Sequence, residues 1–345
     1  MAAPFNARLS DLLHKAQGAA LNARSAEDVK AALAGSGSLS DYFDRYLSTL
    51  DDRGAYWEGK KYRCLRTKLE HVFGRPLAWG PLDRTGLTRF ERFLRDPPPR
   101  GCSNQANTIR SELKRLRRLA RRAIRDGALR VDADPFLAYD PPKSQPVSRR
   151  RLSAREVEGL SALELDVDSR LRVVRDLFLI AYYAAGVRVS DMLTMKLENV
   201  VREGTIARLV YRMQKTGTPM APKLPSIALD VLGTYLEAAR RGSYLFPLMQ
   251  PGDDTDPVDL RRRQARATAK ANEALKRLAV QAGINPAGLS THVARHSWAD
   301  AARQVGNLYA VSKGLGHKGL KTTEAYLAEM DMAAVDAITD SLWNG

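Results

Sequence analysis

The chain has 345 residues, and its 55 lysines and arginines against 39 aspartates and glutamates give a formal net charge of +16. A hydrophobic fraction of 44% excludes a disordered chain, two cysteines exclude a disulfide framework or cysteine-built zinc site, and the longest apolar run, Leu177 to Val187, is too short to cross a bilayer. We therefore expect a cytoplasmic protein of about two domains with no membrane partner, and a polyanion such as nucleic acid as its partner. The alternative is that the charge serves only solubility.

The first part of the chain is predicted to be helical. Residues 1–38 form an alanine-rich N-terminal extension that ends in a Gly-Ser-Gly-Ser break. Residues 39–130 then carry apolar side chains at helical spacing, and we expect a helical domain. The spacing places helices from residue 39 onward and over about 60–73, 85–94 and 107–126.

The last of these helices has an unusually one-sided charge. Nine basic and only two acidic residues lie between Arg110 and Arg130, and Gly127 is placed to end the helix. A solvated helix face usually mixes both signs, so this pattern favours a face laid on DNA phosphates over a merely solvated one. The candidate DNA-binding residues are Arg110, Lys114, Arg117, Arg118, Arg121 and Arg125.

A linker and a second domain follow. Four prolines and a run of three arginines over residues 131–152 predict a linker without regular structure. Ser153 and Glu156 form a capping box that opens the second domain, residues 153–330. A buried helix over 176–185 is expected to end at Gly186, and a short helix to restart with Ser190 as its N-cap.

The second domain contains a β region, and the chain ends in an apolar stripe. β-branched and aromatic residues over 206–213, a turn at 216–219 and a strand to about residue 226 predict a hairpin within 204–227. Helices are expected over 228–240, 261–282, 292–305 and 321–330, with a short turn near 311–315. The fold class is thus mainly α with a small antiparallel β-sheet: a helical N-terminal domain and a mixed α+β second domain. The tail, 331–345, places Val335, Ile338 and Leu342 at helical spacing, to pack on its own core or on a neighbouring protomer.

Six reactive side chains stand in a distinctive order in the second domain. Each is weak evidence alone, because a single histidine, lysine or tyrosine is more often structural or solvated. Three of the five histidines fall within the stretches that hold these six residues, and two of the six, one helical turn apart, share a helix face. The six are Arg188, Lys215, His292, Arg295, His317 and Tyr326.

In these stretches the chain resembles the tyrosine recombinase (phage integrase) family. The matching motifs are Ala-Ala-Gly-Val-Arg-Val-Ser-Asp at 184–191, Gln-Lys-Thr-Gly at 214–217, Ser-Thr-His-Val-Ala-Arg-His-Ser-Trp-Ala at 290–299, Leu-Gly-His-Lys at 315–318 and Thr-Thr-Glu-Ala-Tyr at 322–326. The resemblance covers about 150–330 and extends weakly over 39–130, which looks like the family's helical core-binding domain. The short segment before residue 39 favours a Cre- or Xer-like layout without a separate arm-binding module.

The resemblance implies a role for each of the six residues. Arg188 and Arg295 would offer forked, permanently charged donors to the non-bridging oxygens of a DNA phosphate. Tyr326 would be the nucleophile, His292 the base, His317 a hydrogen-bond donor to a phosphoryl oxygen and Lys215 the acid for the departing 5′-oxygen. Asp191 is expected to orient Arg188 or cap its helix.

The implied function is site-specific DNA recombination through a 3′-phosphotyrosyl intermediate. The resemblance implies double-stranded DNA as partner, a homo-tetramer on DNA and no metal or other cofactor. Whether Tyr326 acts in its own protomer's site or a neighbour's is open at this point, as is any need for accessory proteins. The alternatives are a type IB topoisomerase, with similar chemistry in a monomer, and a non-catalytic DNA-binding protein. The latter gives no reason for six reactive residues in this order.

Overall fold

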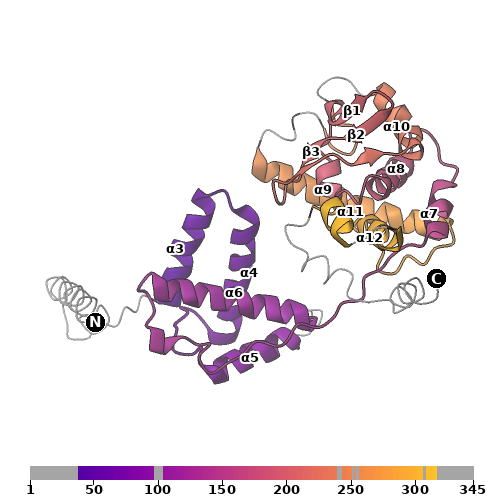
Figure 1. The fold of residues 1–345 in the computed structure, drawn as a ribbon. Helices are drawn as coiled ribbons and strands as arrows, with labels where there is room; N and C mark the ends of the chain where they lie inside the picture. Colours follow the sequence, from indigo (N-terminus) through magenta and orange to yellow (C-terminus); the bar gives the residue numbers. More distant parts are fainter. Residues whose placement is uncertain are drawn as a thin grey trace, which may run out of the picture. The chain divides into compact units, whose positions relative to one another are not determined.

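The computed structural model describes residues 38–96, 104–238, 243–250, 252, 256–305 and 308–316. Contacts divide the chain into two compact units, Met1–Val147 and Ser148–Gly345, each with its own hydrophobic core. Helices make up most of the described structure and the strands are few and short, so the predicted class, mainly helical with a small antiparallel sheet, is confirmed (Figure 1). None of the described helices combines the length and apolar character that a bilayer crossing requires.

Within its described residues, the first unit contains four α-helices, each within four residues of its predicted bounds. Ser38 and Asp41 cap the first helix reciprocally, and Asp83 accepts the amide of Gly86 to cap the third. Gly127, with φ of +73°, follows the fourth helix as predicted. The helices are α3 (Leu39–Asp52), α4 (Tyr56–Phe73), α5 (Arg84–Arg95) and α6 (Ala106–Arg125).

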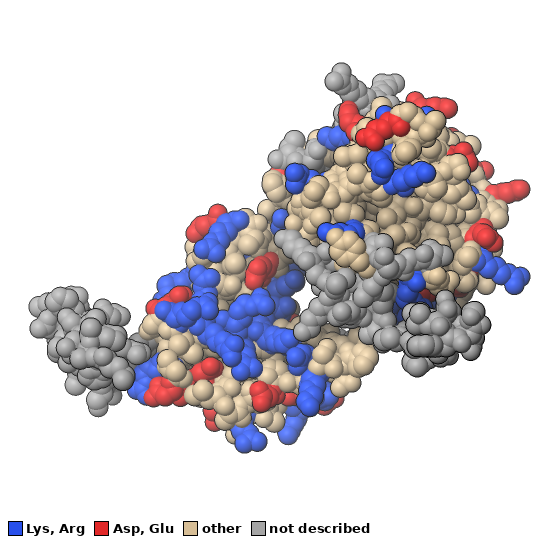
Figure 2. All heavy atoms as spheres, in the orientation of Figure 1, with Lys and Arg blue, Asp and Glu red and all other residues tan. Residues whose placement is uncertain are grey.

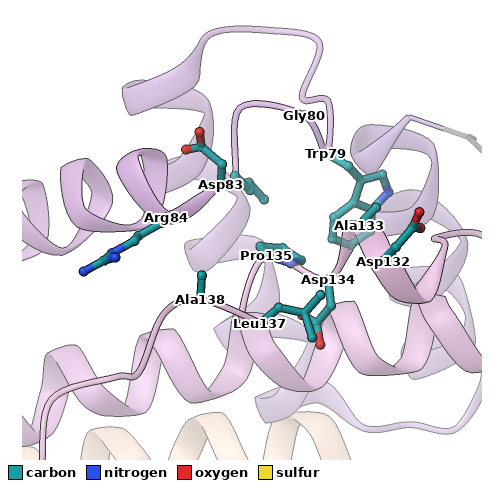
Figure 3. A pocket seen from close by; sticks show the side chains of 11 residues that line it. Trp79, Gly80, Asp83, Arg84, Asp132, Ala133, Asp134, Pro135, Leu137 and Ala138 are labelled. Carbon is teal, nitrogen blue, oxygen red and sulfur yellow. The ribbon is translucent and has the colours of Figure 1, made fainter.

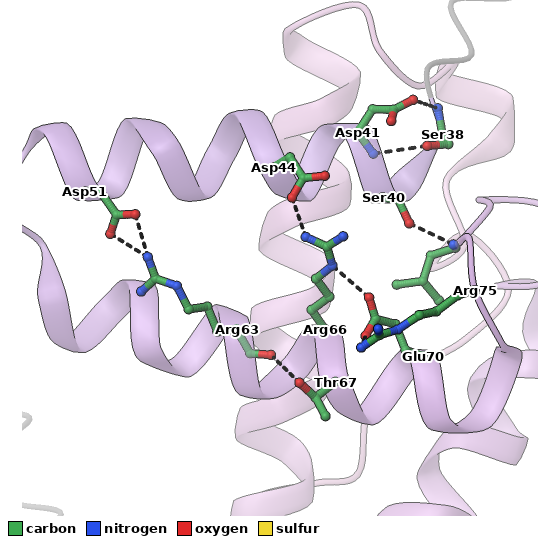
Figure 4. A network of polar contacts seen from close by, with 11 residues as sticks. Ser38, Ser40, Asp41, Asp44, Asp51, Arg63, Arg66, Thr67, Glu70 and Arg75 are labelled. Atoms are coloured by element: carbon green, nitrogen blue, oxygen red, sulfur yellow. Dashed lines mark hydrogen bonds and ion pairs between the residues drawn. The ribbon is translucent and has the colours of Figure 1, made fainter.

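Ion pairs fasten α3 to α4 along their exposed edge (Figure 4). Arg63 pairs with Asp51 at 2.5 Å, and Arg66 bridges Asp44 of α3 and Glu70 of its own helix. Such exposed pairs contribute only about 0.2–1 kcal/mol each, so the apolar core beneath them carries most of the stability. These cations are therefore committed to the fold of the unit.

The predicted linker begins later than the sequence suggested. Residues 131–133 form a 3-10 helix, and Phe136 and Tyr139 are buried in the core of the first unit. Further along, the side-chain amide nitrogen of Asn107 in α6 donates a hydrogen bond to the carbonyl of Gln145, and Asn107 Oδ1 accepts one from the backbone amide of Gln145. The prolines stop helices and strands, as expected, but the aromatic residues between them bind this stretch to the first unit.

In the second unit, α8 is the central helix, since it packs against α7, α9, α10, α11 and α12. The capping box of Ser153 and Glu156 opens α7 as predicted. The bounds are α7 (Ala154–Ser161), α8 (Arg170–Tyr183), α9 (Val189–Met192), α10 (Ser226–Ala238), α11 (Pro257–Gln281), α12 (Val293–Val305) and α13 (Leu308–Gly314).

Two boundary predictions in this unit were wrong. Helix α8 starts at Arg170 and not at Asp176, because the buried Asp176 carboxylate accepts from Tyr235 Oη at 2.8 Å and Arg175 Nε at 2.7 Å and so remains inside the helix. The N-cap of α9 is Arg188, and Ser190 lies within the helix. The predicted helix at 321–330 and the tail stripe of Val335, Ile338 and Leu342 lie outside the described residues, as does most of the N-terminal extension.

The β region consists of a three-stranded antiparallel sheet, in the order β1-β2-β5, and a separate β3–β4 hairpin. The predicted single strand over 206–213 is interrupted at Val210, whose amide and carbonyl both bond to Asn199. The sequence prediction also missed β1, which precedes residue 204. The strands are β1 (Val200–Glu203), β2 (Ile206–Leu209), β3 (Tyr211–Arg212), β4 (Pro219–Met220) and β5 (Lys223–Leu224).

Candidate active site

A tight turn between α8 and α9 presents Arg188. Ala185 and Gly186 have φ of +62° and +67°, and the amide of Val187 bonds back to the carbonyl of Ala181. A Cβ on Gly186 would lie 3.0 Å from Cα of Arg295, so only glycine fits here without displacing the backbone of α12. Arg188 follows this turn in extended conformation, half-buried, and its Nη1 donates to the sulfur of Met213 at 3.0 Å.

Arg295 lies directly beneath the same turn. It is only 2% exposed, and its two terminal nitrogens donate to the carbonyls of Gly186 at 2.9 Å and Leu315 at 2.5 Å. A buried guanidinium held by two backbone carbonyls has a fixed orientation, because neither acceptor can move without moving its segment. The turn that presents Arg188 thus also positions Arg295.

Lys215 lies in the loop of the β3–β4 hairpin, as predicted, and is exposed. Hydrogen bonds from Gln214 join the base of this loop to α9 and the residues that follow it. The backbone amide of Gln214 donates to the buried Asp191 carboxylate at 3.0 Å, and the side-chain amide of Gln214 donates to Thr194 Oγ1 at 2.7 Å. Gln264 of α11 adds bonds to Ser190 and Gln214. Asp191 therefore anchors the hairpin. The sequence predicted that Asp191 orients Arg188 or caps α9, and neither role includes this contact.

His292 opens α12 and faces the cations of the site. Its ring lies edge-on to that of His296, with centroids 4.7 Å apart. Partial burial of the ring, and after it the charges of Arg295, Arg188, Lys215 and Arg149, together lower the pKa of His292 to about 4, although the residue is exposed at the surface. The imidazole is therefore neutral at pH 7 and able to accept a proton.

Four of the six predicted residues thus converge in the second unit, while His317 and Tyr326 lie outside the described residues. Among the described contacts, Asp191 supplies the only carboxylate beneath this cluster. Burial raises the pKa of Asp191, while the hydrogen bond from the Gln214 amide and the charges of Arg188 and Arg295 lower it. Several cations with one buried carboxylate leave excess positive charge, which suits an anionic ligand such as a phosphodiester.

The six candidates on α6 divide into two groups. Arg110 donates to the carbonyl of Pro142, and Arg117 lies over the ring of Phe136 and 4.0 Å from Asp140, so both hold the chain that follows the helix. The other four recur every three or four residues along one exposed stripe, and Arg118 has a loose pair with Glu58 at 3.8 Å. The stripe consists of Lys114, Arg118, Arg121 and Arg125, and Figure 2 shows lysines and arginines gathered over α6.

The sequence prediction passed over a second basic helix surface, on α11. The apolar side of α11 is buried and its opposite side carries mostly cations, which the sequence could have revealed through the run of arginines at 261–263. Asp256 caps the helix by accepting the amide of Val258. The exposed cations are Arg261, Arg262, Arg263, Arg266, Lys270, Lys276 and Arg277.

A separate pocket of about 350 Å³ lies in the first unit, between the loop before α5 and the segment after α6 (Figure 3). Its acidic residues have local roles: Asp83 caps α5, Asp134 accepts the amide of Phe136, and Asp132 pairs with Arg130. The acidic side chains of this pocket are therefore engaged in local structure and do not form a reactive cluster. Nowhere in the described part of the chain do three histidine, cysteine or acidic side chains gather as a metal site.

Comparisons with known proteins relate both units to one family. Residues 150–332 match the phage integrase family, and residues 38–139 match the phage integrase SAM-like domain. Tyrosine recombinase XerD of Vibrio cholerae is 30% identical over 245 residues, covering 70% of this chain and 75% of that protein. XerD of Xanthomonas axonopodis is 32% identical over 62% of this chain and 69% of that protein. The chain spans 60% of the length of XerC of Roseiflexus castenholzii, at 30% identity over 57% of this chain.

Solved structures show the same fold. The Tn1549 transposon integrase in complex with a circular intermediate DNA superposes with a TM-score of 0.61 at 15% identity, covering 89% of this chain and all of that one. A lambda integrase dimer bound to a COC′ core site gives a TM-score of 0.57 at 21% identity, covering 86% of this chain and 98% of that one. At these identities the likeness establishes a shared architecture.

Proposed function

Because the chain belongs to the phage integrase family and is a tyrosine recombinase, we propose that it cleaves and rejoins double-stranded DNA at a specific site through a 3′-phosphotyrosyl intermediate. The observation that carries this proposal is the convergence of Arg188, Arg295, Lys215 and a neutral His292 in one unit. No single element of the chain supplies this set, so its assembly depends on the fold.

In the cleavage step, the Tyr326 oxygen attacks the scissile phosphorus while His292 takes the phenolic proton. A phenol has a pKa near 10, so a neighbouring base is needed at neutral pH. The guanidiniums of Arg188 and Arg295, with His317, stabilise the charge that grows on the non-bridging oxygens. The bond to the 5′-oxygen breaks, Lys215 protonates that oxygen, and a 5′-hydroxyl is released.

Rejoining reverses these steps with a 5′-hydroxyl from the partner strand. The phosphotyrosyl bond conserves the energy of the phosphodiester, so the exchange needs no nucleotide hydrolysis. Each group then acts in the opposite sense: Lys215 takes the proton from the attacking hydroxyl and His292 returns one to the tyrosine.

DNA binding is assigned to the two basic helix surfaces. The stripe of α6 and the exposed cations of α11 supply phosphate contacts in the first and second units, respectively. We assign residues 39–130 as the core-binding domain and 153–330 as the catalytic domain. Four protomers act on two sites, and the tail stripe of Val335, Ile338 and Leu342 packs on the next protomer in a ring.

The proposal is tested by trapping the covalent intermediate. Duplexes are taken from the DNA that adjoins the gene, scanned for an inverted repeat with arms of roughly 10 base pairs, and nicked so that the released strand diffuses away. The unaltered protein should yield an adduct that survives denaturing electrophoresis. Tyr326→Phe should bind the same duplex and yield none.

Tyr309→Phe is the matched control, because Tyr309 is an exposed phenol on α13 in the same unit. It should form adduct at the normal rate. An adduct in Tyr326→Phe, or its loss in Tyr309→Phe, would remove Tyr326 as the nucleophile. Relaxation of any supercoiled plasmid without a preferred site would point instead to a topoisomerase.

A further inference from the structure

Helix α11 carries two amide side chains that bond to segments of the proposed active site. Gln264 is only 6% exposed, and the half-buried Asn272 follows it two helical turns later, about 12 Å further along the helix axis. Polar groups that are buried in a folded protein are almost always hydrogen-bonded, so their partners indicate what they hold in place.

Gln264 holds the base of the β3–β4 hairpin. Its Nε2 donates to Gln214 Oε1 at 3.1 Å and to the carbonyl of Ser190 at 2.8 Å. The side-chain amide of Gln214 donates to the same Ser190 carbonyl, at 3.2 Å, and to Thr194 Oγ1. The two glutamines thus share one acceptor and join the hairpin to α9 and α11. Since Lys215 directly follows Gln214, this network sets where the hairpin presents Lys215.

Asn272 holds the segment that leads into α12. Its Oδ1 accepts the backbone amide of Thr291 at 2.8 Å, and Thr291 is only 4% exposed. His292 is the next residue, and its carbonyl accepts the amides of Arg295 and His296 in the first turn of α12. A hydrogen bond to the backbone directly before His292 therefore fixes the place from which its imidazole extends.

We propose that α11 positions the two proton-transferring groups of the reaction, with Gln264 acting on the acid Lys215 and Asn272 acting on the base His292. The proposal rests on the roles of Lys215 and His292 in the proposed function. Both amides are positioning residues, because they bond to the segments that carry the reacting groups. The outer side of the same helix carries the exposed cations assigned to phosphate contacts, so one helix sets the acid and the base relative to the DNA.

The two positioning roles can be separated through the leaving group. In the natural duplex, the bond from phosphorus to the 5′-oxygen breaks and that oxygen takes a proton from Lys215. In a duplex with sulfur in place of the 5′-bridging oxygen, a thiolate leaves without an acid, because a thiol has a pKa of only about 8.5. Transfer of the Tyr326 proton to His292 is needed in both reactions. A misplaced acid therefore slows only the oxygen duplex, whereas a misplaced base slows both.

The first experiment compares Gln264→Met with Asn272→Leu on nicked duplexes of both kinds. Each substitution keeps the approximate shape of the side chain and removes its amide. Gln264→Met should slow adduct formation about tenfold on the oxygen duplex, out of the roughly 10²- to 10⁴-fold that a positioned acid contributes, and leave the sulfur duplex within about twofold of normal. Asn272→Leu should slow both duplexes about tenfold. Asn272→Asp keeps the accepting oxygen and should restore most of both rates.

The matched control is Gln281→Met, which removes an exposed glutamine from the end of the same helix and should change neither rate. Since the released strand diffuses away from a nicked duplex, the final yield of adduct counts the folded molecules and should stay normal in every variant. If Gln264→Met does not fold, Gln214→Met removes the exposed partner of that bond and carries the same expectation.

Three results of this experiment would overturn the proposal. Equal slowing of the oxygen and sulfur duplexes in Gln264→Met would mean that Gln264 does not act through the acid. Normal rates in Asn272→Leu, or a loss confined to its oxygen duplex, would mean that Asn272 does not act through the base. A lower yield of adduct at a normal rate would show that the amides only stabilise the fold.

The second experiment, amide hydrogen exchange without DNA, distinguishes failure of this proposal from failure of the proposed function. Gln264→Met should speed exchange about fivefold within residues 211–220, the effect of losing one hydrogen bond, and leave residues 291–296 unchanged. Asn272→Leu should do the reverse. If the unaltered protein forms no adduct on either duplex, the proposed function fails, while this pattern still decides whether α11 holds the two segments. Faster exchange throughout the second unit in both variants would contradict the proposal.

Discussion

The two units use the same residue types in opposite ways. In the first unit, Lys114, Arg118, Arg121 and Arg125 come from one helix and spread outward along its exposed face. In the second, Arg188, Lys215 and the pair His292 and Arg295 come from three separate segments and converge on one place. An outward stripe supplies affinity spread over several phosphates, whereas a convergent cluster concentrates charge on one.

The two arrangements also differ in what holds them. The stripe needs only a stable helix, because each of its cations reaches solvent independently. The cluster needs Gly186 to let α12 approach, two backbone carbonyls to fix Arg295 and the buried Asp191 to anchor the hairpin. Substitutions in the first unit should therefore act mainly on binding, and those in the second on the reaction.

The largest effect is expected from Arg188→Ala. This guanidinium makes one described hydrogen bond, to the sulfur of Met213, so its removal should cost little stability. Loss of one preorganised donor to a developing negative charge should slow adduct formation by about 10²- to 10³-fold. Quench-flow or manual sampling with saturating nicked duplex measures the rate, and a binding assay on the same DNA should show less than about a tenfold loss of affinity, one phosphate contact. A variant that loses affinity but reacts normally once bound would break the contrast between the units.

Neutralising the stripe should produce the reverse result. Lys114→Gln, Arg121→Gln and Arg125→Gln together should reduce the slope of log affinity against log salt by about 2.7, or 0.9 for each lost phosphate contact. The rate of adduct formation at saturating DNA should stay normal. Arg110→Gln and Arg117→Gln are matched controls from the same helix, because both side chains hold the segment that follows it. A slope that changes in the controls and not in the stripe variant would place the DNA contact on the other side of α6.

The sequence predicted the first unit more fully than the second, for a physical reason. Helix α6 has its apolar and basic residues at fixed spacing, so both its existence and its exposed face can be derived locally. The strand β1 spans only Val200–Glu203 and is defined by pairing with β2, which no short pattern reveals. Asp176 looks like a helix start until Tyr235, distant in sequence, satisfies its carboxylate.

The site shows the same limit. Motifs nominate Arg188, Lys215, His292 and Arg295, but the groups that position them lie far along the chain or belong to the backbone. The carbonyls of Gly186 and Leu315 and the amide of Gln214 have no side-chain signature. Arg151 appeared only as charge in a linker, because its ion pair with Asp300 of α12 joins residues that lie far apart in the sequence.

A pair of glycines gives a smaller and sharply matched comparison. Gly127 of the first unit and Gly186 of the second both have positive φ, but a Cβ on Gly127 would meet nothing within 4 Å, whereas one on Gly186 would lie 3.0 Å from Cα of Arg295. Gly127→Ala should cost about 1–2 kcal/mol of unfolding free energy, the left-handed strain alone. Gly186→Ala should cost about 3 kcal/mol and slow the reaction, because Arg295 must shift. Urea unfolding measures the loss of stability in each variant, and the adduct assay measures the reaction rate. Equal losses of stability in the two variants would mean that α12 shifts to accommodate the added methyl group at little cost.

The last expected effect is a dependence of stability on pH that belongs to the second unit. Burial and neighbouring charges lower the pKa of His292 to about 4 and of His296 to about 3, against about 6.5 in an unfolded chain. Between pH 6.5 and 4 the unfolded state therefore binds more protons than the folded state, so stability rises with pH across this window and is lost as the pH falls. The measurement is amide hydrogen exchange of α8 compared with that of α6, corrected for intrinsic exchange rates. A range from pH 7.5 to 5.0 lies above the pKa values of most carboxyl groups. Protection of α8 should decline more steeply than that of α6, and the double variant His292→Gln, His296→Gln should reduce the difference. Parallel profiles for the two helices in the unaltered protein would show that the imidazoles are not held neutral by the fold.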